Sequence, residues 1–235
     1  MARVFVIPDV HLKTWIFDEA ADCLSKGKYD YIVCLGDLVD DWEMEYNLPL
    51  YEETLQSALR FAEQNENALF CYGNHDVSYV WQKMETGYSS VARPVVVENY
   101  NRLERFLNDR IRFVHQIDNV LFSHAGLTLE FVEEWFEPIM DDIDAVLKEV
   151  NTSCHALELW SDNSPIWARP QFCHFEMYPK NMLQVVGHTP VESPILDGYV
   201  LSVDTFSTYR DGTPIGNQRF VWIDTDTREW GYVDK

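Results

Sequence analysis

Residues 31–40 read Tyr-Ile-Val-Cys-Leu-Gly-Asp-Leu-Val-Asp. The first five are apolar or β-branched, which predicts a short buried strand that ends at Gly36. Asp37 and Asp40 follow at once, so this strand delivers two carboxylates to its carboxyl end. Ligands of open α/β sheets bind just beyond the carboxyl ends of strands, so the pattern predicts an α/β fold with a polar site at that edge.

Two runs of the same kind flank this strand. Residues 3–7 and residues 68–72 are both apolar, and each ends in a proline or a glycine followed by polar residues. Helical patterns cover about residues 15–25 and 50–64 in between. The order strand, helix, strand, helix, strand at this spacing predicts a parallel sheet.

The second half of the chain is richer in strands. Residues 111–115 and 120–123 predict a hairpin, and residues 129–150 are mostly helical. Taken together, residues 1–235 are expected to form a single α/β (α+β) domain. Further short strands are expected at residues 183–186, 195–196, 199–203, 219–223 and 229–233.

The segment 127–181 allows two interpretations. It could be a helical, aromatic insertion that caps the site, or its aromatic side chains could form a satellite core. The aromatic residues concerned are Trp160, Trp167, Phe172, Phe175 and Tyr178.

The charge of the chain excludes some partners. It carries 18 basic and 39 acidic residues, a net charge of −21, so nucleic acid and anionic membrane surfaces should be repelled. No stretch approaches the roughly 20 apolar residues of a membrane helix, and the N-terminus does not read as a signal peptide. The five cysteines show no paired spacing, which predicts reduced thiols and a cytoplasmic location. The oligomeric state stays open.

Polar side chains follow each of the three expected parallel strands, so they should meet in one crevice. Asp9 and His11 are two residues apart, and in an extended segment such side chains point the same way, toward one metal ion. Asp37 has two carboxylate oxygens and could bridge two ions, while Asn74 offers a neutral carbonyl oxygen. A mixed set of oxygen and nitrogen donors suits manganese, iron or zinc.

Two later histidines also stand at strand ends beside small residues. His124 lies in Ser-His-Ala-Gly at 123–126, and His188 lies in Gly-His-Thr-Pro at 187–190. The remaining cysteine–histidine pairs, Cys154-His155 and Cys173-His174, could alternatively form a second site, which would bind zinc. The closely paired ligand spacing of zinc sites is absent there, so these residues are read as partly buried thiols with neighbouring surface histidines.

The five motifs occur in the order Asp-x-His, Gly-Asp-x-x-Asp, Gly-Asn-His-Asp, Ser-His-Ala-Gly and Gly-His-Thr-Pro, between residues 9 and 190. In this order they resemble the calcineurin-like metallophosphoesterases, and among these the bacterial and bacteriophage serine/threonine protein phosphatases. The resemblance implies a two-sheet β-sandwich flanked by helices. It also implies two divalent metal ions, with manganese expected and iron or zinc as alternatives.

The resemblance also implies a role for each site residue. One ion would be held by Asp9, His11 and the bridging Asp37. His75 would protonate the leaving oxygen, and Asp40 would orient His75. The second ion would be held by Asp37, Asn74, His124 and His188.

The phosphate-binding residues match the resemblance less completely. The segment 166–170 is similar to one that supplies a phosphate-binding arginine in phage-type phosphatases, which implies that role for Arg169. Many protein phosphatases of this group carry a second arginine after Gly-Asp-x-x-Asp, but this chain has Asp41 and Trp42 there. An acid facing a phosphate would repel it. This difference from the family pattern therefore puts a phosphoprotein substrate in question.

We therefore expect a metal-dependent phosphoesterase in which a metal-activated hydroxide attacks the phosphate ester. Its substrate would be a phosphopeptide or a phosphorylated small molecule, and a serine/threonine protein phosphatase is one possibility. A nucleotide or phosphodiester hydrolase of the same fold is the first alternative. A non-catalytic scaffold is the second, although such a chain should lack metal ligands or His75, and all are present.

Overall fold

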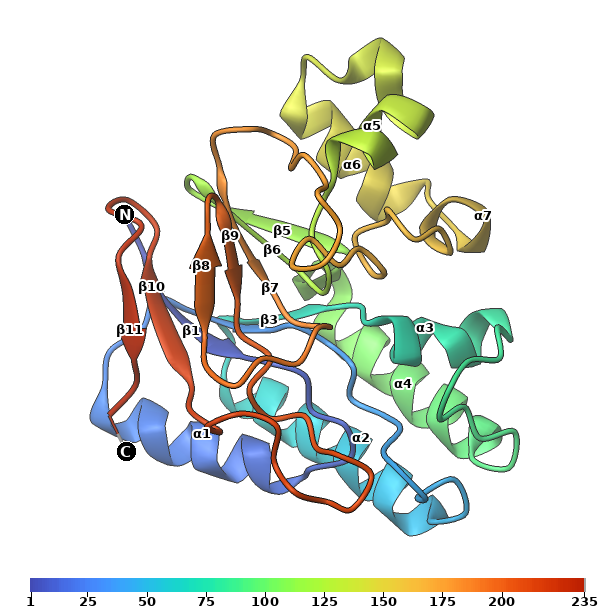
Figure 1. The fold of residues 1–235 in the computed structure, drawn as a ribbon. Coiled ribbons are helices and arrows are strands. Elements are labelled where there is room, and N and C mark those ends of the chain that lie inside the picture. The colour runs from blue at the N-terminus through green and yellow to red at the C-terminus, as the bar shows by residue number, and fades with distance from the viewer. Residues whose placement is uncertain (235) are drawn as a thin grey trace.

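The computed structural model describes residues 1–234 and contains two β-sheets that face each other, with helices on both outer sides (Figure 1). The first sheet has six strands in the order β11-β10-β1-β2-β3-β4, and the second has five in the order β5-β6-β7-β9-β8. The chain is thus an α/β sandwich of two sheets flanked by helices, as the resemblance implied.

The first sheet has a parallel centre and an antiparallel edge. Strands β1 to β4 run parallel to their neighbours, whereas β10 pairs antiparallel with β1 and β11 antiparallel with β10. Its strands are β1 (Arg3–Ile7), β2 (Tyr31–Cys34), β3 (Ala68–Cys71), β4 (Ile111–Arg112), β10 (Val221–Asp224) and β11 (Trp230–Tyr232).

The second sheet contains the hairpin β5-β6, then β7 and β9 parallel to β6, and β8 antiparallel at the edge. The carboxyl ends of β6 and β7 therefore point the same way. Its strands are β5 (Val114–Ile117), β6 (Val120–Ser123), β7 (Leu183–Val186), β8 (Ile195–Asp197) and β9 (Val200–Ser202).

The strands of the first sheet are apolar on both faces because both faces are covered. In β1, Val4 and Val6 pack between the two sheets, while Phe5 and Ile7 pack against the helices on the other side. Successive side chains of a strand point to opposite faces, so a strand buried on both sides reads as a continuous apolar run. The strands of this sheet were predicted from such apolar runs in the sequence.

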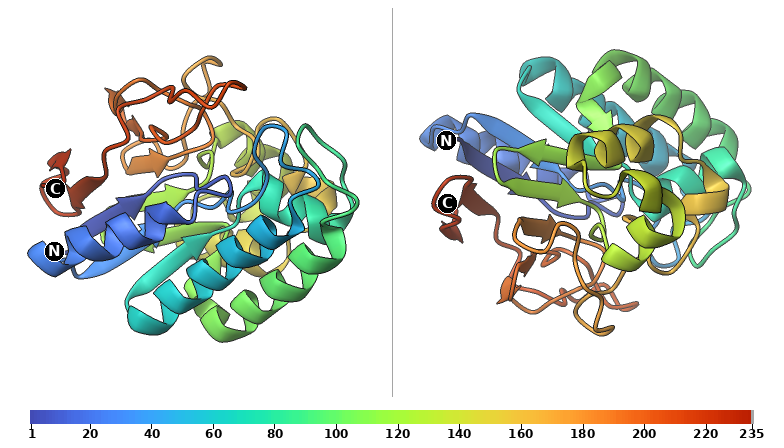
Figure 2. Two further views of the ribbon diagram at one scale, coloured as in Figure 1. Left: turned by 90° about the horizontal axis from the view of Figure 1, so that it is seen from below. Right: turned by 90° about the horizontal axis from the view of Figure 1, so that it is seen from above.

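Helices cover the outer face of each sheet (Figure 2). Two helices were not predicted: α3 (Asn74–Trp81), which follows β3, and α4 (Arg93–Leu107). Helix α4 is amphipathic, and its buried residues Val96, Tyr100, Leu103 and Leu107 recur at helical spacing. The helices are α1 (Trp15–Lys26), α2 (Leu48–Gln64), α3 (Asn74–Trp81), α4 (Arg93–Leu107), α5 (Leu129–Phe136), α6 (Ile143–Thr152) and α7 (Ala156–Leu159).

The prediction of one strand at residues 111–115 was wrong. The chain changes sheets there: Ile111–Arg112 pairs with β3, and Val114–Ile117 pairs with β6. The backbone N–H groups of Phe113 and Val114 donate to Oδ1 of Asn151 at 2.9 and 3.1 Å. A side chain from α6 therefore satisfies the backbone groups at the break, which no local pattern reveals.

The aromatic residues of the segment 127–181 are divided between two environments. Trp160, Trp167 and Tyr178 pack in an apolar cluster with α5, α6 and α7, as expected of a satellite core. Phe172 is 73% exposed instead. Whether this segment closes over a substrate stays a prediction. Among the described helices, none combines the length and the apolar character required to cross a lipid bilayer.

His115 lies in β5, and its burial makes the fold sensitive to acid. The ring is 4% exposed and its Nε2 donates to the carbonyl of Phe70 at 2.8 Å. Burial lowers the pKa of His115 to about 4, although the hydrogen bond to Phe70 partly opposes this. Because the unfolded chain takes up a proton near pH 6.5 and the folded chain does not, stability is lost as the pH falls from 6.5 to 4.

We predict that His115→Gln flattens this part of the stability profile. Between pH 7 and pH 4, the free energy of unfolding of the wild type should fall by about 3 kcal/mol more than that of His115→Gln. Urea unfolding at several pH values measures the difference, and His155→Gln, at an exposed histidine, is the control. Parallel profiles for wild type and His115→Gln would contradict the prediction.

Candidate metal centre

The loops that follow β1, β2, β3, β6 and β7 meet at one edge of the sandwich. The loops after β1 and β2 are tied together, because the N–H groups of Val10 and His11 donate to the carbonyl of Asp37 at 3.0 and 2.7 Å. The structure brings the six predicted metal ligands and the predicted catalytic pair to this edge: Asp9, His11, Asp37, Asn74, His124 and His188, with Asp40 and His75.

One group of donor atoms converges around His124. Its Nε2 lies 2.9 Å from Oδ1 of Asn74, 3.1 Å from Nδ1 of His188 and 3.3 Å from Oδ2 of Asp37. Donor atoms bound at about 2.1 Å to a tetrahedral or octahedral ion lie about 3 Å or slightly more from one another. These four residues are therefore already arranged at the spacing of a coordination shell.

A second group shares Asp37 with the first. Nε2 of His11 lies 3.7 Å from Oδ2 of Asp37 and 4.0 Å from Oδ2 of Asp9. These three residues offer donor atoms that all lie within 4.8 Å of one another. Asp37 thus stands between two groups, each of which could hold an ion.

The histidine tautomers also suit metal binding. Nδ1 of His124 donates to the carbonyl of Leu35 at 2.9 Å, and Nδ1 of His11 donates to the carbonyl of Asp40 at 2.9 Å. Because Nδ1 of each ring is used by a carbonyl, Nε2, which faces the carboxylates, is the nitrogen that could bind an ion. A histidine that binds metal is commonly oriented in this way by a hydrogen bond from its other nitrogen.

The charges at this edge are unbalanced without cations. Asp9, Asp37, Asp40 and Asp204 are all at most 2% exposed, and Oδ1 of Asp9 has no hydrogen-bond partner among residues 1–234. Burial, followed by the neighbouring charge of Asp204, raises the pKa of Asp9 well above its usual range. Divalent ions would offset this clustering of carboxylates, so the residues present fit a pair of them.

The backbone is held in uncommon conformations at the same residues. His11, Asp37, Asp40 and His188 have φ angles of 44°, 47°, 66° and 60°. Residues other than glycine seldom adopt positive φ, and such strained positions concentrate at functional sites. Close approach also requires Gly187, where an added Cβ would lie 2.0 Å from Oδ1 of Asp9. The loops are therefore shaped to aim these side chains.

His75 lies beside the two groups. Its Nδ1 donates to Oδ2 of Asp40 at 2.9 Å, and Oδ1 of Asp40 accepts hydrogen bonds from the hydroxyls of Tyr51 and Tyr79. Burial lowers the pKa of His75, but the charge of Asp37 and the bond to Asp40 outweigh it and raise the pKa to about 10. Asp40 thus orients His75 and keeps its Nδ1 protonated.

Two further acidic residues of the site were missed. Asp204 follows β9, so the rule of polar residues after a parallel strand could have found it. Glu85 lies in the loop after α3, where no motif marks it; its Oε2 accepts from Nδ2 of Asn74 at 2.8 Å. That bond leaves the Oδ1 atom of Asn74 facing His124.

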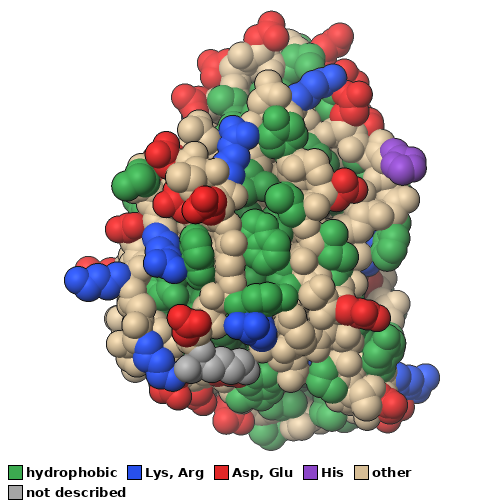
Figure 3. Space-filling view, turned by 60° about the vertical axis from the view of Figure 1, so that its left-hand side comes forward, with side chains coloured by type: hydrophobic (Ala, Val, Ile, Leu, Met, Phe, Trp, Pro, Cys, Tyr) green, Lys and Arg blue, Asp and Glu red, His purple; other side chains and the backbone are tan. Residues whose placement is uncertain are grey.

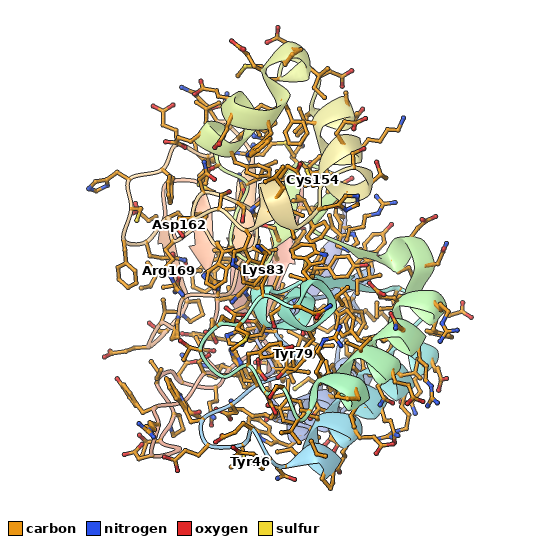
Figure 4. All side chains as sticks on the ribbon, turned by 90° about the vertical axis from the view of Figure 1, so that its right-hand side faces the viewer. Tyr46, Tyr79, Lys83, Cys154, Asp162 and Arg169 are labelled. Carbon is orange, nitrogen blue, oxygen red and sulfur yellow. The ribbon has the colours of Figure 1, made fainter. Side chains whose placement is uncertain are left out.

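A cavity of about 610 Å³ opens over the metal centre. Arg169 lines it from the segment between α7 and β7 (Figure 4). Nη1 of Arg169 donates to the carbonyl of His188 and to Oγ1 of Thr189, both at 3.2 Å. Within residues 1–234, Nε and Nη2 of Arg169 have no partner, so they remain available to a ligand.

Asp41 also lines this cavity, but it does not present an isolated negative charge. Its Oδ2 accepts a hydrogen bond from Nζ of Lys13 at 3.1 Å. The acid that stands where an arginine was expected is thus paired with a lysine.

The alternative zinc site does not form. Cys154 is buried in the apolar cluster beside α6, and Cys173 is exposed. Across the part of the chain that the structure describes, neither of the two groups of potential metal ligands includes them. None of the five cysteines, all of which lie within the described residues, forms a disulfide.

The fold and the two donor groups define a metal-binding hydrolase. A family model described as calcineurin-like phosphoesterase matches residues 2–203, and the chain belongs to that family; it is a metallophosphoesterase. No curated protein matches the chain by sequence.

Two solved structures show the same fold. A cold-active protein tyrosine phosphatase from a psychrophilic Shewanella species is 18% identical, with a TM-score of 0.54, over 100% of this chain and 81% of that one. A protein serine/threonine phosphatase from Saccharomyces cerevisiae is 11% identical, with a TM-score of 0.50, over 99% of this chain and 80% of that one. At such identities the likeness concerns the fold alone.

Proposed function

We propose that the chain is a manganese-dependent phosphomonoesterase that acts on phosphorylated hydroxyl groups of peptides, as a serine/threonine protein phosphatase does. The observation that carries this proposal is the shared cavity: the two donor groups, the His75–Asp40 pair and Arg169 all meet there. Asp9, His11 and Asp37 would hold one ion, and Asp37 would also contribute to the second. The remaining residues for the second ion are Asn74, His124 and His188.

When bound, the two ions would supply the hydroxide nucleophile and offset the charge of the phosphate. The free donors of Arg169 would bind and orient the phosphate oxygens. Nε2 of His75 would deliver a proton to the departing oxygen, while Asp40 holds the ring in place. The chain thus needs neither a serine nor a cysteine nucleophile.

Acidic residues around the cavity favour a leaving group without further negative charge. Asp41 and Glu43 line the cavity as ion pairs with Lys13 and Arg210, and Glu45 adds a further acidic side chain to the lining. On the face that Figure 3 shows, acidic side chains are interspersed with basic ones. A polyphosphate or a nucleic acid would be repelled, whereas a single phosphate on a neutral or basic peptide would be accepted. The reduced state of the five cysteines supports a cytoplasmic location.

A substrate screen with manganese, iron or zinc tests the proposal. Phosphoserine and phosphothreonine peptides, nucleotides, p-nitrophenyl phosphate and phosphodiesters should be compared by kcat/KM. We expect the phosphopeptides and the simple monoester to be hydrolysed best. Preference for nucleotides or diesters would indicate a nucleotide or phosphodiester hydrolase instead. Inactivity with every metal and substrate would favour a non-catalytic scaffold.

We predict that Arg169→Ala lowers kcat/KM for phosphomonoesters by roughly 10- to 150-fold, the worth of a hydrogen bond between charged groups. Arg169→Lys should recover little, because an ammonium cannot present the planar fork of donors. Arg102→Ala, at an exposed arginine of α4, is the control. If Arg169→Ala is as active as this control, the segment 166–170 contributes only to packing and does not bind the phosphate.

A further inference from the structure

Lys13 lies in the wall of the catalytic cavity, two residues beyond His11. Its Nζ donates to the carbonyl of His11 at 3.2 Å and to Oδ2 of Asp41 at 3.1 Å. The side chain is only 10% exposed, and it lines the same cavity as His75 and Arg169. A nearly buried ammonium group thus stands beside the metal centre.

The surroundings of Lys13 hold this ammonium in place. Burying a charge costs several kcal/mol unless the charge is paired, and Asp41 provides the partner. Asp41 is itself oriented, since its Oδ1 accepts from the N–H of Trp42 at 2.8 Å and from Oγ1 of Thr208 at 3.4 Å. The Lys13–Asp41 ion pair is therefore held by neighbouring residues and is not a flexible surface contact.

The ammonium retains one free donor. Of its three N–H bonds, two have partners, and the third has none within the described residues 1–234. A free, positively charged donor at the edge of a phosphate site is an anion contact.

We propose that Lys13 is a second phosphate contact besides Arg169, and that it makes the enzyme prefer dianionic monoesters to monoanionic diesters. This inference rests on the proposed function of the cavity. A phosphomonoester carries nearly two negative charges at neutral pH, and a diester carries one and has a substituent on one more oxygen. A compact ammonium held by Asp41 stabilises the extra charge and supplies the cation that is missing at position 41.

Three variants separate the charge of Lys13 from its structural pairing. Lys13→Met removes the ammonium, Asp41→Asn removes only its partner, and the double variant removes both charges without leaving an unpaired acid. If Lys13→Met does not fold, Lys13→Gln keeps a donor toward Asp41. Each manganese-loaded protein is titrated with orthophosphate by calorimetry, and kcat/KM is measured for p-nitrophenyl phosphate and for bis-p-nitrophenyl phosphate.

We expect Lys13→Met and the double variant to bind orthophosphate roughly tenfold or more weakly, as for loss of one charged hydrogen bond. Their monoester-to-diester ratio of kcat/KM should fall by a similar factor, while Asp41→Asn, which keeps the ammonium but removes the acid that holds it, should lower the ratio less. If the double variant binds orthophosphate and discriminates like the wild type, Lys13 is only a structural partner and the inference is overturned. If the wild type hydrolyses no monoester but Lys13→Met still weakens orthophosphate binding, the contact stands and the proposed function falls.

Discussion

Asp37→Asn is expected to lower kcat for any phosphomonoester by about 10³-fold or more, which corresponds to ~4 kcal/mol or more in the barrier. Asp37 belongs to both donor groups, and its Oδ2 lies 3.3 Å from Nε2 of His124 and 3.7 Å from Nε2 of His11. An amide has no negative charge and only one oxygen, so both ions would lose the same partner. The metal content should fall below two ions per chain.

The measurement combines turnover with elemental analysis of protein reconstituted in manganese. Asp22→Asn, at an exposed carboxylate of α1, is the matched control and should keep the wild-type rate and metal content. An Asp37→Asn protein with two ions per chain and a rate within tenfold of the wild type would refute the bridging role.

His75→Asn should keep the metal ions but slow the hydrolysis of alkyl phosphates by about 10²–10⁴-fold, the usual contribution of a general acid. The geometric reason is the bond of 2.9 Å from Nδ1 to Asp40, which aims the other ring nitrogen at the cavity. The loss should be much smaller for p-nitrophenyl phosphate, because p-nitrophenolate departs readily without a proton.

Comparison of the two kinds of leaving group is therefore the decisive measurement for His75. His174→Asn changes an exposed histidine and should leave both rates unaltered. Equal losses on alkyl and nitrophenyl esters, with full metal content, would show that His75 positions the substrate and does not donate the proton.

Local rules predicted the strands and the side chains at their ends. Asp9, Asp37 and Asn74 were found because each follows a buried apolar run, and this pattern depends only on neighbouring residues. The partners that orient these side chains were not predicted. Tyr51 and Tyr79 bond Asp40 from two different helices, and Glu85 bonds Asn74 from a loop without a motif.

The change of sheets after β4 was missed for the same reason. The break is completed by Asn151, which is 38 residues away from Phe113. Similarly, the sequence presented Asp41 as an acid facing a phosphate, whereas in the structure it is paired with Lys13, 28 residues earlier. Contacts of this kind depend on how separate elements pack.

By itself, the sequence determined the identity and order of the donor residues, the parallel sheet and the acidic character of the chain. The family resemblance implied how these donors are grouped and that Asp40 orients His75. Only the tertiary structure showed how close the donor atoms lie to one another, that Tyr51 and Tyr79 bond Asp40, and that Lys13 pairs with Asp41 in the cavity. The N–H of His188 bonds Asp9 across 179 residues of chain, at 2.9 Å. Such distances are set by the packing of two sheets against each other, because burying their apolar faces brings together strand ends that no local interaction connects.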